Sequence, residues 1–196
     1  MRCMMCEGWS FSHICKPCRS EYLTPSLYKK KILGNIPVYS FYKYSDIETL
    51  LHTKHTDLGY YIYTILAKQT MKHFSSNFDY EGRVAAIGID DHVRNGYSHT
   101  ALLAKALRSK QIKPHYGKLR AQNKESYSGQ SFQFRLLHPR NFEMKPFDEE
   151  EVILVDDILT TGMTLTQAAE ALHREGKKVL FCLTLADADE KPTPVK

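Results

Sequence analysis

Apolar residues in this chain occur either in short compact runs or at the spacing of an amphipathic helix, and the two patterns alternate. The compact runs of strand length lie in 84–89, 152–155 and 177–186. The segments with helical spacing are 58–74, 99–110 and 164–176, the last with Gly176 at its C-cap position. Apolar strands that alternate with helices are typical of a parallel sheet with right-handed crossovers. We therefore predict an α/β fold with a mainly parallel sheet flanked by helices.

Two further segments predict strands, and the remaining chain is irregular. Residues 35–45 are aromatic and β-branched with local alternation, which indicates a strand or a β-hairpin, and 113–119 indicates one more strand. Residues 120–150 predict a loop with small irregular elements, and a loop that long is usually functional or disordered. Residues 191–196 predict a flexible tail.

The first segment of the chain is rich in cysteine and poor in aliphatic side chains. Two C-x2-C pairs, eight residues apart, consist of Cys3, Cys6, Cys15 and Cys18. Four thiolates at this spacing can surround a tetrahedral Zn²⁺, whose binding would fold a segment with too little apolar surface of its own. An iron–sulfur cluster also takes four cysteines. We predict a zinc-binding finger at 1–24, in which the ion is structural because protein sulfur fills all four positions.

Composition indicates an ordinary globular protein. Apolar residues make up 42% and charged residues 25% of the chain. No apolar run approaches the roughly 18 residues of a membrane span, and the N-terminus lacks the apolar core of a signal peptide. We therefore expect a cytoplasmic protein that could still dock on a membrane protein. Reducing conditions in the cytoplasm favour zinc over disulfides at the four cysteines.

Two adjacent carboxylates, Asp156 and Asp157, follow the apolar run 152–155, and a threonine-rich loop leads from them into the next helix. Ligands of parallel α/β sheets bind at the carboxyl ends of strands. Gly162 permits close backbone approach, while threonine hydroxyls and the N–H groups of the helix N-terminus favour an anion such as phosphate. The carboxylates would repel phosphate and suit sugar hydroxyls or a divalent cation. A phosphate beside a diol is a ribose 5-phosphate.

No G-x4-GK[ST] element occurs, so the acidic strand does not indicate a P-loop nucleotide-hydrolysing enzyme. The string VILVDDILTTGMT instead resembles the phosphoribosyl diphosphate (PRPP) binding motif of type I phosphoribosyltransferases. The resemblance implies that Asp156 and Asp157 bond the ribose 2′- and 3′-hydroxyls and that Mg²⁺ accompanies PRPP. It also implies a 5-phosphate loop made of Thr160, Thr161, Gly162, Met163 and Thr164. The phosphoribosyltransferase-like domain would span 25–190.

The order of cysteine pairs, hairpin, middle segment and C-terminal PRPP motif is similar to that of the ComF-type competence proteins. The segment HVRNGYSHTALLAKAL resembles their R-x-RGFNQ-x-x-LA stretch, and TKHTDLG resembles their lysine segment after the first hairpin. The resemblance implies a cytoplasmic role in uptake of single-stranded DNA during natural transformation, beside the DNA-translocation machinery of the inner membrane. Candidate phosphate or pyrophosphate contacts are Arg94, Lys54 and Arg120. Arg94 is one residue displaced from the doubled-arginine form, and a solvated lysine is the alternative for Lys54.

The charge distribution is compatible with a polyanionic partner. Residues 1–145 hold 22 Lys and Arg against 11 Asp and Glu, whereas 146–196 hold 5 against 11. Within 105–142, nine basic residues and five aromatic residues accompany a single acid, a composition typical of sequence-tolerant single-strand binders. The candidate DNA contacts are Lys110, Lys113, Lys118, Arg120, Lys124, Arg135 and Arg140. A solvated charged surface, or a loop that only clamps pyrophosphate, is the alternative.

A transferase would also need a second site for the accepting base, usually an aromatic or apolar hood. The segment after the last strand has no aromatic residue that could stack on a base. Trp9 and Phe11 are candidates for a hood, although we expect them to pack over the metal or on the body of the protein. These features favour a PRPP-binding DNA-uptake factor. An active phosphoribosyltransferase with an unknown acceptor and a PRPP-sensing regulator stay open as alternatives.

Overall fold

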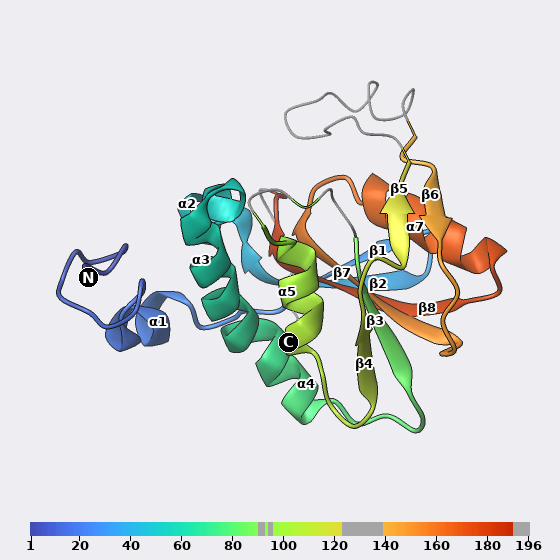
Figure 1. Ribbon diagram of the computed structural model, residues 1–196, viewed down its shortest axis with the longest axis horizontal. Helices are drawn as coiled ribbons and strands as arrows, with labels where there is room; N and C mark the ends of the chain where they lie inside the picture. The colour runs from blue at the N-terminus through green and yellow to red at the C-terminus, as the bar shows by residue number, and fades with distance from the viewer. Residues whose placement is uncertain (90–92, 94–95, 123–138, 190–196) are drawn as a thin grey trace.

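A six-stranded sheet forms the centre of the molecule in the computed structural model, which describes residues 1–89, 93, 96–122 and 139–189 (Figure 1). The strand order is β1-β2-β8-β7-β3-β4. The strands are β1 (Tyr28–Ile32), β2 (Ile36–Lys43), β3 (Val84–Gly88), β4 (Ile112–His115), β7 (Glu151–Leu159) and β8 (Lys178–Asp187). Within this sheet β1 and β2 form an antiparallel hairpin, and every other neighbouring pair is parallel. The predicted mainly parallel α/β sheet is confirmed.

Helices cover both faces of the sheet (Figure 1). One face carries α2 (Tyr44–Leu51), the 3-10 turn η1 (His52–His55), α3 (Asp57–Ala67), the π turn η2 (Lys68–Lys72), α4 (His73–Asn77) and α5 (His99–Ala106). The other face carries α7 (Met163–Arg174) and a small antiparallel sheet of β5 (Leu119–Ala121) and β6 (Phe142–Met144). A hydrophobic core lies on each face of the sheet, and successive side chains of β7 pack into the two cores in turn. Ile153 and Val155 pack on the α3 side, and Val152 and Leu154 pack on the α7 side.

β7 is longer than the apolar run that predicts it. The run ends at Val155, but strand pairing continues to Leu159, so both acids lie inside β7 and not after it. On one side β8 continues beside this stretch and pairs Asp187 with Leu159. On the other side β3 stops at Gly88, opposite Val155. Among the described residues, the last part of β7 therefore pairs with a strand on one side only.

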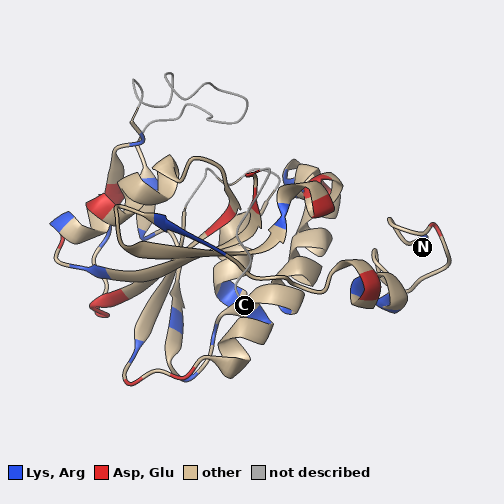
Figure 2. Ribbon diagram, turned by 180° about the vertical axis from the view of Figure 1, so that it is seen from behind, with Lys and Arg blue, Asp and Glu red and all other residues tan. Residues whose placement is uncertain are grey.

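The two edges of the sheet, β1 and β4, carry residues that are unusual in central strands. β1 contains three consecutive lysines, Lys29 to Lys31, which Figure 2 shows as a blue stretch of strand. Lys30 reaches the buried Asp187 at the end of β8, with 2.7 Å between Nζ and Oδ1. β4 contains Pro114, which has no backbone N–H to give to a further strand.

The N-terminal segment extends from one end of the molecule (Figure 1) and contains α1 (Lys16–Tyr22). Its apolar anchors to the body are Ile14 and Leu23, which are fully buried and join the core on the α3 side of the sheet. The Tyr42 hydroxyl donates to the Leu23 carbonyl at 2.9 Å. The boundary of a separate finger at residue 24 stays a prediction.

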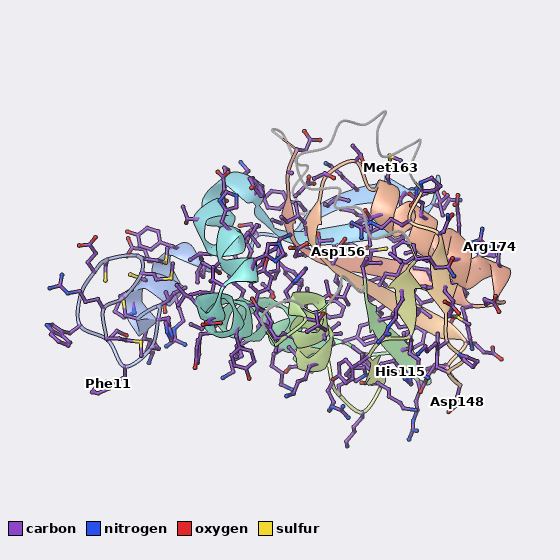
Figure 3. The ribbon with its side chains drawn as sticks, turned by 45° about the horizontal axis from the view of Figure 1, so that its top comes forward. Phe11, His115, Asp148, Asp156, Met163 and Arg174 are labelled. Carbon is purple, nitrogen blue, oxygen red and sulfur yellow. The ribbon has the colours of Figure 1, made fainter. Side chains whose placement is uncertain are left out.

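The aromatic residues of this segment lie on its outside. Trp9 is 86% exposed and Phe11 is fully exposed, so the expectation that they pack over the metal or on the body is wrong. Figure 3 shows Phe11 at the outer end of the segment, well away from Asp156. Both rings are in solvent, although the four thiols of the segment lie close to one another. Neither ring forms a hood over the acidic end of β7.

Some predicted features cannot be compared with the fold. Arg94, Lys124, Arg135 and the predicted tail at 191–196 lie outside the described residues. Among the helices that are described, none combines the length and the apolar character needed to cross a membrane.

Candidate functional site

The acid pair lies where the chain leaves two adjacent strands in opposite directions. From β3 the chain runs through α5 to β4, whereas from β7 it runs through α7 to β8. The helices α5 and α7 cover opposite faces of the sheet, so the carboxyl ends of β3 and β7 form a topological switch point of the sheet. Asp156 and Asp157 follow Val155, the last residue of β7 that pairs with β3. The topology alone makes this the expected ligand position of the sheet.

Asp157 points to the face of α3 and α5 and is surrounded there by polar groups from three elements. Its Oδ2 lies 3.0 Å from the ammonium of Lys54 in η1 and 3.2 Å from the hydroxyl of Tyr63 in α3. The Nε2 atom of His99, in the first turn of α5, lies 3.6 Å from the same oxygen. Asp157, Tyr63 and His99 are all buried. A buried carboxylate is tolerated here because donors and positive charge surround it.

The electrostatics favour an ionised Asp157. Burial by itself raises the pKa of this carboxyl, but the nearby charges of His99 and Lys54 outweigh it and hold the pKa well below its usual range. Burial and the charge of Asp157 raise the pKa of the Tyr63 phenol well above its usual value. Tyr63 therefore stays a neutral hydrogen-bond donor to a charged acceptor.

Asp156 points to the opposite face of β7, because successive side chains of a strand alternate between faces. Burial, and then the charge of Asp156, raise the pKa of the Cys182 thiol, which belongs to the core on the α7 side. The Asp156 Oδ1 atom accepts the backbone N–H of Asp157 at 2.8 Å. The two carboxylates thus lie on either side of the strand. Both carboxylates lie beyond Val155, the last residue of β7 that pairs with β3 in the described part of the chain.

The loop after β7 turns sharply into α7. Gly162 has φ +75°, in the left-handed region, and it is the N-cap residue of α7. A Cβ atom at this position would lie 2.8 Å from Cγ2 of Ile32, so both the backbone angle and the packing require glycine. Thr160 and Thr161 are exposed at the start of the loop, and Met163 is the first residue of α7. Backbone N–H groups at such a helix start suit an anion.

The four N-terminal cysteines form a second cluster, remote in sequence from the acid pair. The Sγ atoms of Cys3, Cys6, Cys15 and Cys18 all lie within 4.8 Å of one another. The Sγ atoms of Cys6 and Cys15 are 3.8 Å apart, and tetrahedral zinc with sulfur at about 2.3 Å requires sulfur–sulfur distances of about 3.8 Å. The residues present therefore fit a Zn²⁺ ion.

Hydrogen bonding prepares one of these thiols for a metal. Burial raises the pKa of Cys3, but backbone N–H groups directed at its sulfur outweigh burial and lower the pKa to about 6. One of these donors is the N–H of Cys15, at 3.3 Å. A thiolate is the form that binds metal. The hydrogen bond with Cys15, followed by burial, raises the pKa of Cys18.

The other predicted site residues lie in several places. Lys54, expected as a pyrophosphate contact or a solvated lysine, forms the ion pair with Asp157. The guanidinium of Arg120, on β5, packs beside Gly117. Lys110 and Lys113 lie at the amino end of β4, the end of the sheet away from the acid pair. The Lys118 ammonium donates to the Pro146 carbonyl at 2.6 Å, and the Arg140 backbone N–H donates to Gln167 of α7 at 3.0 Å.

Two residues of the site are absent from the sequence-based prediction. Tyr63 lies on the apolar face of its helix, where the pattern predicts a core ring and gives no sign of a functional hydroxyl. His99 follows Ser98, whose side chain accepts the N–H of Ala101 as an N-cap. His99 is a buried polar residue in the first turn of α5, the helix that follows β3, and this placement could have indicated a site residue.

A family model described as the phosphoribosyl transferase domain matches residues 94–196, more than half of the chain. Among curated proteins, none matches the sequence. An orotate phosphoribosyltransferase structure from Aeropyrum pernix is 18% identical with a TM-score of 0.41, covering 87% of this chain and 80% of that one. A hypoxanthine phosphoribosyltransferase from Staphylococcus aureus is 16% identical with a TM-score of 0.39, covering 66% and 68%.

Proposed function

This chain belongs to the phosphoribosyl transferase domain family, and on that basis we propose that it binds PRPP at the carboxyl end of β7. The observation that carries the proposal is that the acid pair and the Gly162 turn both lie at the carboxyl end of β7, beyond the last residue that pairs with β3. Carboxylates accept hydrogen bonds from the two ribose hydroxyls, and the start of α7 offers N–H groups to the 5-phosphate.

Lys54 is the residue that would respond to the ligand. In the free protein its ammonium neutralises Asp157 at 3.0 Å. In the proposed complex it turns to the pyrophosphate group, while ribose hydroxyls donate to the carboxylate oxygen that it leaves. The Lys54 ammonium and the Asp157 carboxylate would each have a polar partner both before and after the ligand binds, which limits the cost of desolvating these charges. Asp156 and Asp157 also offer the oxygen ligands that Mg²⁺ prefers, and the ion would neutralise pyrophosphate when bound.

The experiment is a calorimetric titration of PRPP with Mg²⁺ into the zinc-loaded full-length protein. Asp156→Asn and Asp157→Asn together should weaken binding by about a hundredfold, because both acceptors of the ribose hydroxyls change to amides. Asp148→Asn, on an exposed residue outside the site, is the matched control and should bind as the wild type does. Unchanged affinity in the double variant, with an unchanged melting temperature, would remove the site assignment.

We further propose that the protein is a cytoplasmic DNA-uptake factor, acting on incoming single-stranded DNA at the inner membrane. The support is the resemblance to ComF-type competence proteins and a basic depression of about 490 Å³. It is lined by Arg83, Arg108, Ser109, Lys110, Ile112 and Lys113. Lys113 pairs with Glu149 at 3.0 Å, and among the described residues no acid pairs with the other three cations. Cations without acidic partners attract the phosphates of a nucleic acid.

Gel-shift measurements with single-stranded oligonucleotides at low salt test the DNA proposal. Arg108→Ala with Lys110→Ala should weaken binding and flatten its salt dependence, by about 0.7 in the logarithmic slope for each phosphate that the variant no longer neutralises. Lys72→Ala, on exposed helix surface, is the control. Absence of any shift with the wild type, or normal transformation in cells that lack the protein, would contradict the role. Release of pyrophosphate from PRPP with a base or an amine would instead favour an active transferase.

A further inference from the structure

A row of aromatic contacts connects the cysteine-rich segment to η1. His13, which lies between the two C-x2-C pairs, stacks on Tyr61 of α3 with ring centroids 4.5 Å apart. Tyr61 meets Tyr60 edge to face at 5.5 Å, and Tyr60 meets Tyr97 in the same manner at 5.9 Å. The Tyr97 hydroxyl donates to the backbone carbonyl of Lys54 at 2.6 Å. A side chain of the metal-binding segment is thus in contact, through three tyrosines, with the residue that pairs with Asp157.

The end of this row at Tyr97 is tightly packed against α3 and η1. Gly59 of α3 faces both Tyr97 and η1, and a Cβ atom there would lie 2.2 Å from the Tyr97 hydroxyl and 2.2 Å from the Thr53 carbonyl oxygen. The first turn of α3, Tyr97 and the backbone of η1 are therefore in direct contact. A change in the position of α3 must be followed by η1, because close-packed elements transmit displacement and do not absorb it. The Lys54 ammonium moves with η1.

We propose that Tyr97 is a positioning residue for Lys54 and that metal binding by the four cysteines strengthens PRPP binding through the contact of His13 with Tyr61. The inference rests on the proposed PRPP site. With the metal bound, the segment is folded and the His13 ring is held against α3. Without the metal, the ring loses its fixed place, and α3 and η1 lose one of their packing partners. Ordering Lys54 around the ligand then costs more conformational entropy.

The coupling must act in both directions. If the bound metal raises PRPP affinity by some factor, PRPP raises metal affinity by the same factor. A zinc-selective chelator that leaves Mg²⁺ free should therefore need a higher free concentration to remove half of the zinc when PRPP and Mg²⁺ are present. This second readout does not depend on any catalytic activity.

His13 can be tested without disturbing the cysteines. His13→Ala removes the stacked ring and should weaken PRPP binding by about threefold to tenfold in calorimetry of the zinc-loaded protein. His13→Phe keeps a flat ring and should retain nearly the wild-type affinity. His73→Ala, an exposed histidine of α4, is the control and should change nothing. Chelation should weaken PRPP binding by the wild type but have little further effect on His13→Ala.

Tyr97 is tested by removing one hydroxyl. Tyr97→Phe keeps the ring contact with Tyr60 but not the hydrogen bond to Lys54, and PRPP affinity should fall by about twofold to tenfold. Tyr80→Phe removes the hydroxyl that donates to Glu151, outside the row, so it should change stability and leave affinity unchanged. Failure of the wild type to bind PRPP would contradict the proposed function. If the wild type binds but His13→Ala and chelation leave affinity unchanged, the coupling is overturned; unchanged affinity in Tyr97→Phe overturns the positioning role.

Discussion

Lys54 and Asp157 form an ion pair between residues 103 positions apart in the chain, with 3.0 Å between Nζ and Oδ2. The pair is protected from solvent, because the Asp157 side chain is 8% exposed and that of Lys54 is 20% exposed. A carboxylate at such a position is stable only while its partners remain, so this one contact contributes both to the fold and to the proposed ligand site.

Lys54→Met should destabilise the protein by about 1–3 kcal/mol at neutral pH, because it leaves a buried carboxylate with less compensation from Tyr63 and His99 alone. The pKa of Asp157 is lower in the folded protein than in the unfolded chain, so its pairing stabilises the fold above the unfolded pKa of about 3.9. That stability is lost as the pH falls through the lower folded pKa. Urea unfolding should show the cost of Lys54→Met at pH 7 and a smaller cost in strong acid.

The matched substitution for this experiment is Lys72→Met, on the exposed end of η2. It removes the same charge from the same face of the sheet, without touching the acid pair. Equal stability losses in the two variants would mean that the Lys54–Asp157 pair contributes nothing specific.

Gly162→Ala should destabilise the protein and weaken PRPP binding. The new Cβ would meet Ile32 at 2.8 Å, and φ at this position is +75°. Gly176 has a similar φ of +72° at the other end of α7, but a Cβ there meets nothing within 4 Å. Both alanine variants should lose about 1 kcal/mol to the backbone angle, and Gly162→Ala should lose more. Thermal melting and calorimetry separate these effects, since only Gly162→Ala should lower PRPP affinity.

Glu149 should make stability depend on pH in the acid range. Burial raises the pKa of this carboxyl, but its own backbone N–H, Lys113 and His115 outweigh burial and lower the pKa from 4.5 to about 2. The stability it contributes is present above the higher value and lost as the pH falls toward the lower one. Glu149→Gln should therefore cost on the order of 1–2 kcal/mol above pH 5 and little near pH 2. A stability profile with the same slope in both proteins would contradict this assignment.

Purified protein should carry one zinc ion per chain. Cys6→Ser removes an exposed ligand and should abolish stoichiometric zinc, with a lower melting temperature because metal binding contributes folding free energy. Cys182→Ala, in the buried core of β8, should lower the melting temperature through a cavity but keep the zinc. Elemental analysis distinguishes the two. Iron in place of zinc, or full metal content in Cys6→Ser, would show that the cluster is of another kind.

The parts of the molecule that follow local patterns were predictable from the sequence. The apolar runs became β3, β7 and β8, and the helical spacings became α3, α5 and α7, because burial on a sheet imposes those periods. The cysteine spacing likewise predicted a cluster that the structure brings together. The clustering of the acid pair and the Gly162 turn at one sheet end follows from their adjacency in the chain.

Features that depend on contacts between distant segments were not predictable. The sequence does not predict β1, because three consecutive lysines interrupt the alternation of apolar and polar residues that indicates a strand. β1 forms through its antiparallel pairing with β2. The short pairing of β5 with β6 joins segments on either side of an undescribed stretch. The partners of Asp157 come from η1, α3 and α5, and no local pattern shows that these elements converge. Only the folded topology assigns Tyr63 and His99 to the site.

The edge strands have a consequence for how the folded chain behaves when crowded. A strand from a second molecule that approached β1 would have to strip water from Lys29 and Lys31, which are both exposed. An approach to β4 would meet Pro114, which lacks the N–H that a continuing ladder needs. Both ends of the sheet therefore resist growth into intermolecular cross-β fibres. The protein should tolerate high local concentration while it remains folded.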